Sequence, residues 1–252
     1  MMRRIILILS FGATVAAQWL NYPAAGIPRL PDGKPNLSAP APKGPDGKPD
    51  LYGLWEEEKV QGPYQIMPLL PSAIKPEDVI LTPEGETWQR QHKEDHFLDA
   101  QCLPRNLVSR VRLEPFKILP LRGTVVILYE LDTTYRQIFT DGRELPKDPN
   151  PAWWGYSVGK WDGDTLVVDT TGFNDAETIL PNGRPHSDAL HIIERFRRRD
   201  FGHLEIQFKI DDPKIYAKPW SFKEEAHLIP DTELLEYICN ENEKDLRHIR
   251  VK

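Results

Sequence analysis

Short turns rich in aspartate and glycine separate a long series of β-branched and aromatic runs, and this alternation points the chain towards an all-β fold. Asp141-Gly142, Asp162-Gly163-Asp164 and Asp200-Phe201-Gly202 end or join runs such as TLVVDTT and HLEIQFKI. Asp-Gly pairs between such runs are strong hairpin signals. We expect about nine or ten strands, the last over 233–239 (ELLEYIC). An antiparallel meander of this length tends to close into a barrel, because closure removes exposed strand edges.

One short helix interrupts this pattern. The segment 82–97 (TPEGETWQRQHKEDHF) begins with Thr82 as an N-cap and Pro83 at the first helical position, and acids follow in the first turn. His92 and His96 stand four residues apart, a spacing compatible with a metal ion. Charged residues separate them and no third ligand is near in the sequence. The pattern therefore predicts a solvated helix end and no metal site.

The first 17 residues have the layout of a signal peptide. Arg3 and Arg4 form the basic start, an apolar run follows from Ile5, and Ala17 precedes the expected cleavage point. The apolar run is shorter than the ~20 residues that span a bilayer. We predict export to the periplasm or the extracellular space, with no transmembrane segment after cleavage. The alternative is an uncleaved N-terminal anchor.

Proline dominates the next section. PDGKPNL (31–37) and PDGKPDL (45–51) form a doublet. Pro-Asp-Gly is turn chemistry, and Pro-rich spacing favours an extended chain. Residues 18–50 are therefore expected to be a leader that wraps or tethers the barrel domain, which fills residues 51–252.

Composition excludes several classes of function. The net charge of −6, without a large basic region, disfavours nucleic acid as a partner. Cys102 and Cys239 are the only two cysteines. In an exported chain they predict one disulfide, the alternative being a reactive thiol or metal ligand. The short motifs of common hydrolases, kinases, dehydrogenases and zinc proteases are missing, and no cofactor is predicted.

Several motifs together resemble a known family. KPDLYGLW, with Gly53 and Trp55, resembles the Gly-x-Trp start of lipocalin-like (calycin) barrels. YRQIFTDGR (135–143), GYSVGKWDGDTLVVDTTGFND (155–175) and HSDALHIIERFRRRDFGH (186–203) look like a family of exported bacterial proteins of this type, frequent in acidobacteria. The resemblance covers most of the mature chain. It implies export and a lipocalin-like barrel, and it brings no activity or catalytic residues.

Successive side chains of a strand point to opposite faces, so the alternation assigns each residue to the inner or the outer face. By this parity Glu194 shares the apolar face of ALHIIERF, Glu224 shares that of WSFKEEAHL, and either Tyr135 or Arg136 points inward from TYRQIF. A buried carboxylate is costly unless it is paired, hydrogen-bonded or protonated. One interpretation is a partly polar cavity. The other is a single structural pair of Glu194 with Arg136, or a bulge that turns the acids to water.

Aromatic and histidine side chains gather near the expected mouth of the barrel. Trp153, Trp154 and Tyr156 lie in NPAWWGY. They either roof a cavity and stack on a ligand ring, or plug the end of the barrel. His191 points away from the apolar face, with His186 near it at the mouth. A satisfied surface histidine is the alternative to a functional one.

These features predict an exported, small-molecule-binding β-barrel. The residues expected to contact the ligand are Glu224, Arg136, Trp153, Trp154, Tyr156 and His186. The alternative is an enzyme, a hydrolase, lyase or isomerase, acting on a small cyclic substrate. In that case Glu194 transfers the proton, with His191 or Tyr135 as its partner.

Overall fold

The computed structural model describes residues 23–57, 76–91, 102–104, 107–108, 114–174, 178–180, 184–239 and 241. The predicted signal peptide, His92 and His96 lie outside the described residues. So does the end of the helix predicted over 82–97, which is described as α1 (Pro83–Gln91). Thr82 caps this helix as expected, accepting a hydrogen bond from the Gly85 N–H at 3.1 Å.

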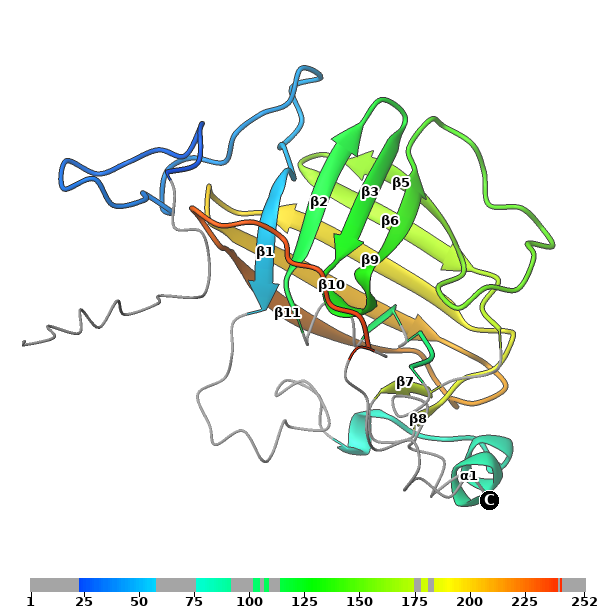
Figure 1. The fold of residues 1–252 in the computed structure, drawn as a ribbon. Coiled ribbons are helices and arrows are strands. Elements are labelled where there is room, and N and C mark those ends of the chain that lie inside the picture. The colour runs from blue at the N-terminus through cyan, green and yellow to red at the C-terminus, as the bar shows by residue number, and fades with distance from the viewer. Residues whose placement is uncertain are drawn as a thin grey trace, which may run out of the picture.

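Nine strands form a closed barrel in the order β1-β11-β10-β9-β6-β5-β4-β3-β2, as Figure 1 shows. Their bounds are β1 Gly53–Glu57, β2 Phe116–Leu121, β3 Thr124–Tyr129, β4 Thr134–Phe139, β5 Tyr156–Asp162, β6 Thr165–Thr171, β9 His191–Arg198, β10 His203–Asp211 and β11 Trp220–Leu228. The connection from β6 to β9 carries a small pair, β7 (Thr178–Leu180) and β8 (Arg184–Pro185), and two 3-10 turns complete the described elements, η1 (Pro76–Asp78) and η3 (Leu131–Thr133). The predicted all-β barrel is confirmed.

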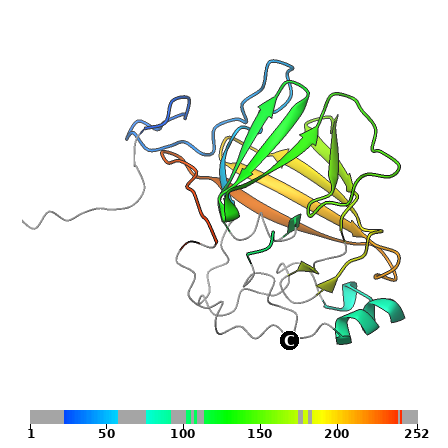
Figure 2. The same ribbon diagram turned by 45° about the vertical axis from the view of Figure 1, so that its right-hand side comes forward.

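One seam of the barrel departs from the antiparallel pattern. β4 and β5 run parallel and pair only through Ile138↔Ser157 and Phe139↔Val158. The antiparallel pair β9 and β10, by contrast, is in register from Leu204↔Arg198 to Asp211↔His191. Because β4 and β5 are parallel, the chain must return between them, and residues 140–155 do so in a long loop on the right of Figures 1 and 2.

The interior follows the predicted alternation. On β10 the apolar residues at every second position are buried, from Leu204 to Ile210. Glu194 is fully buried at 0% exposure and Glu224 is 9% exposed, so both acids do point inward. Large apolar side chains such as Trp55 and Phe196 belong to the buried core.

A buried arginine closes one end of the barrel. Arg198, the last residue of β9, donates to the carbonyl oxygens of Asp50 (2.6 Å), Tyr52 (3.0 Å) and Phe201. Its guanidinium also lies 4.9 Å from the ring centroid of Trp55, a favourable cation–π distance. Burial lowers the pKa of Arg198 to about 10, because the charged form has lost water. Backbone carbonyls replace that water, and Arg198 joins the start of β1 to the β9–β10 turn.

The PDGKP doublet forms two equivalent loops. Leu30 N donates to Lys34 O and Asn36 N to Pro28 O; Gly44 N donates to Lys48 O and Asp50 N to Pro42 O, all at 2.7–2.8 Å. The sequence repeat is therefore also a structural repeat.

The leader lies against the barrel end that carries the β9–β10 turn. Gly202 N donates to Leu37 O at 2.7 Å. A Cβ on Gly202 would lie 2.4 Å from that of Leu37, so only glycine permits this close approach. Asp231 adds a second tie, accepting from Arg29 and Ala24 N. The described residues of the leader thus contact one end of the barrel, and Figure 1 shows them (blue) at the opposite end from α1.

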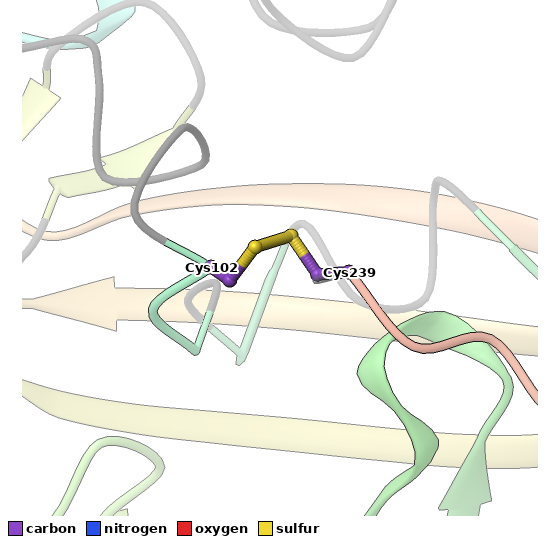
Figure 3. The surroundings of a disulfide bond; sticks show 2 residues. All are labelled: Cys102 and Cys239. Carbon is purple, nitrogen blue, oxygen red and sulfur yellow. A yellow bond between two sulfur atoms is a disulfide. The ribbon is translucent and has the colours of Figure 1, made fainter. Parts of the chain in front are cut away.

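The predicted disulfide is confirmed. Cys102 and Cys239 are bonded, with Cα atoms 5.5 Å apart, and Figure 3 shows the bond joining the C-terminal segment to Cys102. The same segment is fixed to η3: Thr133 Oγ1 donates to Tyr237 O at 3.0 Å, and Leu235 N donates to the buried Glu130 at 3.1 Å.

The strand predicted over 233–239 is wrong. These residues have no strand conformation. The physical reason is barrel closure: β1 occupies the free side of β11 at Ala226–Leu228, where a following hairpin strand would begin, and residues 233–239 are held against η3 instead.

Loss of Arg198 is expected to loosen this closed end. Arg198→Met removes the donors for four carbonyls, those of Asp50, Tyr52, Asp200 and Phe201, and should lower the free energy of unfolding by about 2–3 kcal/mol, measured by urea denaturation. Arg195→Met, in the exposed pair with Asp162, is the control and should cost less than about 1 kcal/mol. Equal losses in the two variants would contradict the closing role of Arg198.

Reduction of the disulfide is expected to destabilise the fold. The bond joins residues 137 positions apart, and a cross-link over so long a loop restricts the unfolded chain strongly, by up to about 5 kcal/mol. Dithiothreitol, or the double variant Cys102→Ser/Cys239→Ser, should therefore lower the unfolding free energy by about 2–5 kcal/mol. An unchanged urea midpoint would count against this.

Candidate functional site

A buried polar cluster joins four strands behind the β4–β5 seam. Arg136 on β4 donates to both carboxylate oxygens of Glu194 on β9, at 2.9 and 2.5 Å. It also donates to Ser157 Oγ on β5 at 3.0 Å and to Thr170 Oγ1 on β6 at 2.9 Å. All four residues are at most 4% exposed. The cluster therefore cross-links the barrel at its shortest ladder.

The charges in this cluster compensate each other. Burial by itself lowers the pKa of Arg136, but the attraction and hydrogen bonds of Glu194 outweigh it, and the pKa of Arg136 is held above its ordinary value. Both oxygens of Glu194 are occupied by the guanidinium. The arrangement is a bidentate ion pair, the geometry in which arginine binds a carboxylate most specifically.

A pocket opens in the barrel wall where β4 and β5 diverge. We call it the β4–β5 slot; its volume is about 520 Å³, and it is lined by Thr133, Thr134, Tyr135, Arg136, Gln137, Phe139, Trp154, Gly155, Tyr156 and Ser157. The lining combines residues from the outer surface, such as Tyr135, with the buried Arg136 and Ser157. The slot therefore reaches from the outside into the wall, down to the polar cluster. Its volume lies within the range of small-molecule sites.

Aromatic rings form much of the slot. Tyr135 is 61% exposed on the outer rim. Phe139 and Tyr156 lie with ring centroids 5.2 Å apart, and Trp154 lies 6.2 Å from the ring of the buried Tyr129. Trp154 thus separates the slot from the barrel core, and the remaining rings give the slot apolar walls.

A second compensated arginine borders the slot. Arg143 lies over the ring of Phe139 at 3.9 Å and donates to the Tyr156 hydroxyl at 2.9 Å. It also pairs with Asp141 at 2.6 Å. Hydrogen bonds to Asp141 and then to Tyr156 raise the pKa of Arg143, and the same pair lowers the pKa of Asp141. Arg136 is the single charged residue in the slot lining, and it too is paired.

Glycine is required at the β5 side of the slot. Gly155 has φ +63°, in the left-handed region. A Cβ there would lie 2.6 Å from Thr171 O and 2.9 Å from Thr170 Cγ2. Gly155 therefore allows the loop 140–155 to turn tightly into β5, beside the polar cluster.

The slot contains four of the residues predicted for the site: Tyr135, Arg136, Trp154 and Tyr156. Of the pair left open in the sequence, Arg136 points inward and Tyr135 outward. Glu194 is buried as predicted, yet Arg136 lies beside it, as in the structural-pair interpretation. Neither Tyr135 nor His191 takes that place.

The other predicted residues lie elsewhere. His191 is on the outer face and binds Asp169 at 2.8 Å. His186 is buried, with Nδ1 3.2 Å from Ser187 O and its ring edge-on to Phe173. Neither histidine, nor Glu224 or Trp153, contributes to the lining of the slot. The alternation of side chains assigns Glu224 to the inner face of its strand. It does not determine which other strands lie across the barrel from that residue.

Several site residues carried no signal strong enough for prediction. Ser157 and Thr170 look like ordinary strand residues, and Gln137 and Phe139 stand in a run whose distinctive residues are Tyr135 and Arg136. For one residue the alternation did carry a signal: Arg198 lies on the same inward face as Glu194. Because Arg198 stands within a run of basic residues, it resembles the solvent-exposed arginines beside it.

Comparison with known proteins gives no match: no family model, curated protein or solved structure is significantly similar to the chain. The closed nine-stranded barrel agrees with a lipocalin-like architecture. Among the described residues, no helix has the length and apolar character needed to cross a membrane.

Removal of the Glu194 charge is expected to destabilise the protein strongly. Glu194→Gln leaves the Arg136 cation buried without its counter-charge, which costs about 3–5 kcal/mol, measured by urea denaturation. The double variant Arg136→Met/Glu194→Leu removes both charges and should recover most of the loss.

The exposed pair Arg195–Asp162 provides the control. Asp162→Asn should change the unfolding free energy by less than about 1 kcal/mol. A Glu194→Gln variant as stable as the wild type would show that the pair does not hold the seam.

Proposed function

We propose that this protein binds a small, uncharged ligand in the β4–β5 slot. The observation that supports this most directly is the combination of aromatic walls and paired charges in one opening of the barrel wall. A pocket with apolar walls and a few fixed polar groups is typical of ligand sites. The export predicted from residues 1–17 completes the proposal: an exported binding protein.

The polar groups of the slot suit a neutral ligand. Thr133, Thr134 and Gln137 offer hydroxyl and amide groups that both donate and accept hydrogen bonds. Arg136 has no uncompensated charge with which to attract an anion, because Glu194 binds it through two hydrogen bonds. A charged ligand would have to shed its water without gaining a counter-charge, which is unfavourable.

The enzymatic alternative has less support. A general acid or base must reach the proton that it transfers. Both oxygens of Glu194 face Arg136, and Glu194 is not part of the slot lining. Tyr135 lies on the outer rim and His191 is paired with Asp169. In this proposal Glu194 organises the slot by holding Arg136, and it transfers no proton.

A ligand screen tests the proposal. Neutral metabolites, including sugars and other small cyclic compounds, are added to the purified protein, and a ligand that binds the folded state raises the melting temperature. Tyr135→Ala should weaken binding of each such compound about tenfold, equivalent to ~1.4 kcal/mol, because a largely exposed tyrosine adds contact area without supporting the fold.

Tyr52→Ala is the matched control. Both tyrosines are largely exposed, Tyr52 at 52% and Tyr135 at 61%. Tyr52 lies outside the slot. This variant should bind as the wild type does. If Tyr135→Ala and Tyr52→Ala give identical affinities, the ligand binds elsewhere, and if no neutral compound binds at all, the proposal fails.

A further inference from the structure

β4 has an edge that the barrel leaves open. β5 pairs with β4 only at Ile138 and Phe139, so the first four residues of β4 have no register partner on that side. On the other side β4 is paired along its whole length with β3, from Tyr129↔Thr134 to Thr124↔Phe139. The barrel is therefore closed by two residue pairs and open beside them, where the slot lies.

The direction of the backbone groups on this edge follows from the ladder. Residues of an antiparallel pair alternate between those that bond the partner strand and those that face away. Thr140 N donates to Gly123 O at 2.9 Å, so every second residue before Thr140 bonds β3 as well. The backbone N–H and C=O of Arg136 are therefore directed to β3.

Tyr135 and Gln137 have the opposite orientation. Each turns its backbone N–H and C=O away from β3, towards the slot. The β2–β3 ladder agrees with this orientation. Glu130 N donates to Pro115 O, so every second residue of β3 counted from Glu130 bonds β2, and the residues between them bond β4. The parallel bridge Ile138↔Ser157 uses the Gln137 C=O, which accepts from the Ser157 N–H because the backbone groups of Ile138 face β3. Within the described parts of the chain, the N–H and C=O of Tyr135 and the N–H of Gln137 have no backbone hydrogen bond on the slot side.

Two N–H groups and one C=O group in this arrangement form the edge of a strand. The two N–H groups are two residues apart, about 6.4–6.8 Å, a repeat that an extended polypeptide matches and a compact ring does not. Unpaired edges of this kind are templates for an added strand. The outward side chains of Tyr135 and Gln137 flank the edge, and Trp154 and Tyr156 form the opposite wall.

We propose that the β4–β5 slot binds a short extended peptide, which adds to β4 through the backbone groups of Tyr135 and Gln137. This inference rests on the proposed function, since it names the ligand class of the same slot. The peptide residues over the slot are uncharged, because the single charged lining residue, Arg136, is already paired with Glu194. Three or four residues, about 10–13 Å in extended form, cover the open edge.

Proline at position 137 tests the backbone contact. Gln137→Pro removes a donor that faces the slot and leaves the β3–β4 ladder bonds in place; proline is tolerated at such edge positions. Gln137→Ala removes the side chain and keeps the donor. The peptides come from a phage-displayed library of random heptapeptides selected on the whole mature chain, and are then synthesised with capped ends.

The expected result is graded. Fluorescence anisotropy should show peptide binding at least tenfold weaker for Gln137→Pro and about threefold weaker for Gln137→Ala, with Tyr52→Ala unchanged. Hydrogen exchange of the Tyr135 and Gln137 amides in the wild type should slow when the peptide is bound. This second measurement decides the matter if Gln137→Pro does not fold.

Four outcomes would overturn the inference: no peptide is enriched, the peptides bind both Gln137 variants equally, the two amides exchange at an unchanged rate, or the wild type is a dimer that Gln137→Pro makes monomeric. The last would mean that a second copy of the chain occupies the edge. A neutral compound that binds through Tyr135 while no peptide does would refute the peptide and leave the proposed function standing. If neither binds, both fail.

Discussion

One buried guanidinium holds the barrel together where its ladder is shortest. β4 and β5 share only two residue pairs, so few backbone hydrogen bonds join them. Side-chain hydrogen bonds of Arg136 add to these, and they join β4 to β5, β6 and β9 through Ser157, Thr170 and Glu194. Such a pair is costly to desolvate, and its value lies in the mutual satisfaction of charge and hydrogen bonds. Because the buried cluster holds β4 and β5 together on the inner side, the two strands can diverge on the outer side, where the slot lies.

The same logic operates at the end of the barrel. Arg198 is buried, forms no salt bridge within the described ranges, and donates to backbone carbonyls of the chain before β1 and of the β9–β10 turn. The leader then covers this end, with Leu37 against Gly202. The two arginines differ in what they support: Arg198 closes a terminus of the barrel, and Arg136 maintains an opening in its side.

Much of the fold and part of the site could be predicted because both depend on local rules. Asp-Gly turns and alternating runs identify the strands, and parity assigned Glu194 and Glu224 to the interior. The prediction failed where a residue's neighbours come from distant strands. ELLEYIC has the composition of a strand, but β1 occupies the end of β11 (Ala226–Leu228) where a following hairpin strand would begin. His191 stood close to Glu194 in sequence and lies on the other face.

By itself, the sequence determined the all-β class, the start of the helix, the disulfide and the inward direction of the two acids, because each follows from spacing within a few residues or from a single pair of cysteines. The tertiary structure alone decided that Arg136 meets Glu194, that β4 and β5 run parallel, and that Tyr135 lies on the rim of a slot. These depend on the path of residues 140–155, which return outside the barrel and set β5 beside only the end of β4. No periodicity within a strand encodes that path, because a strand's pattern fixes its faces and leaves its neighbours open.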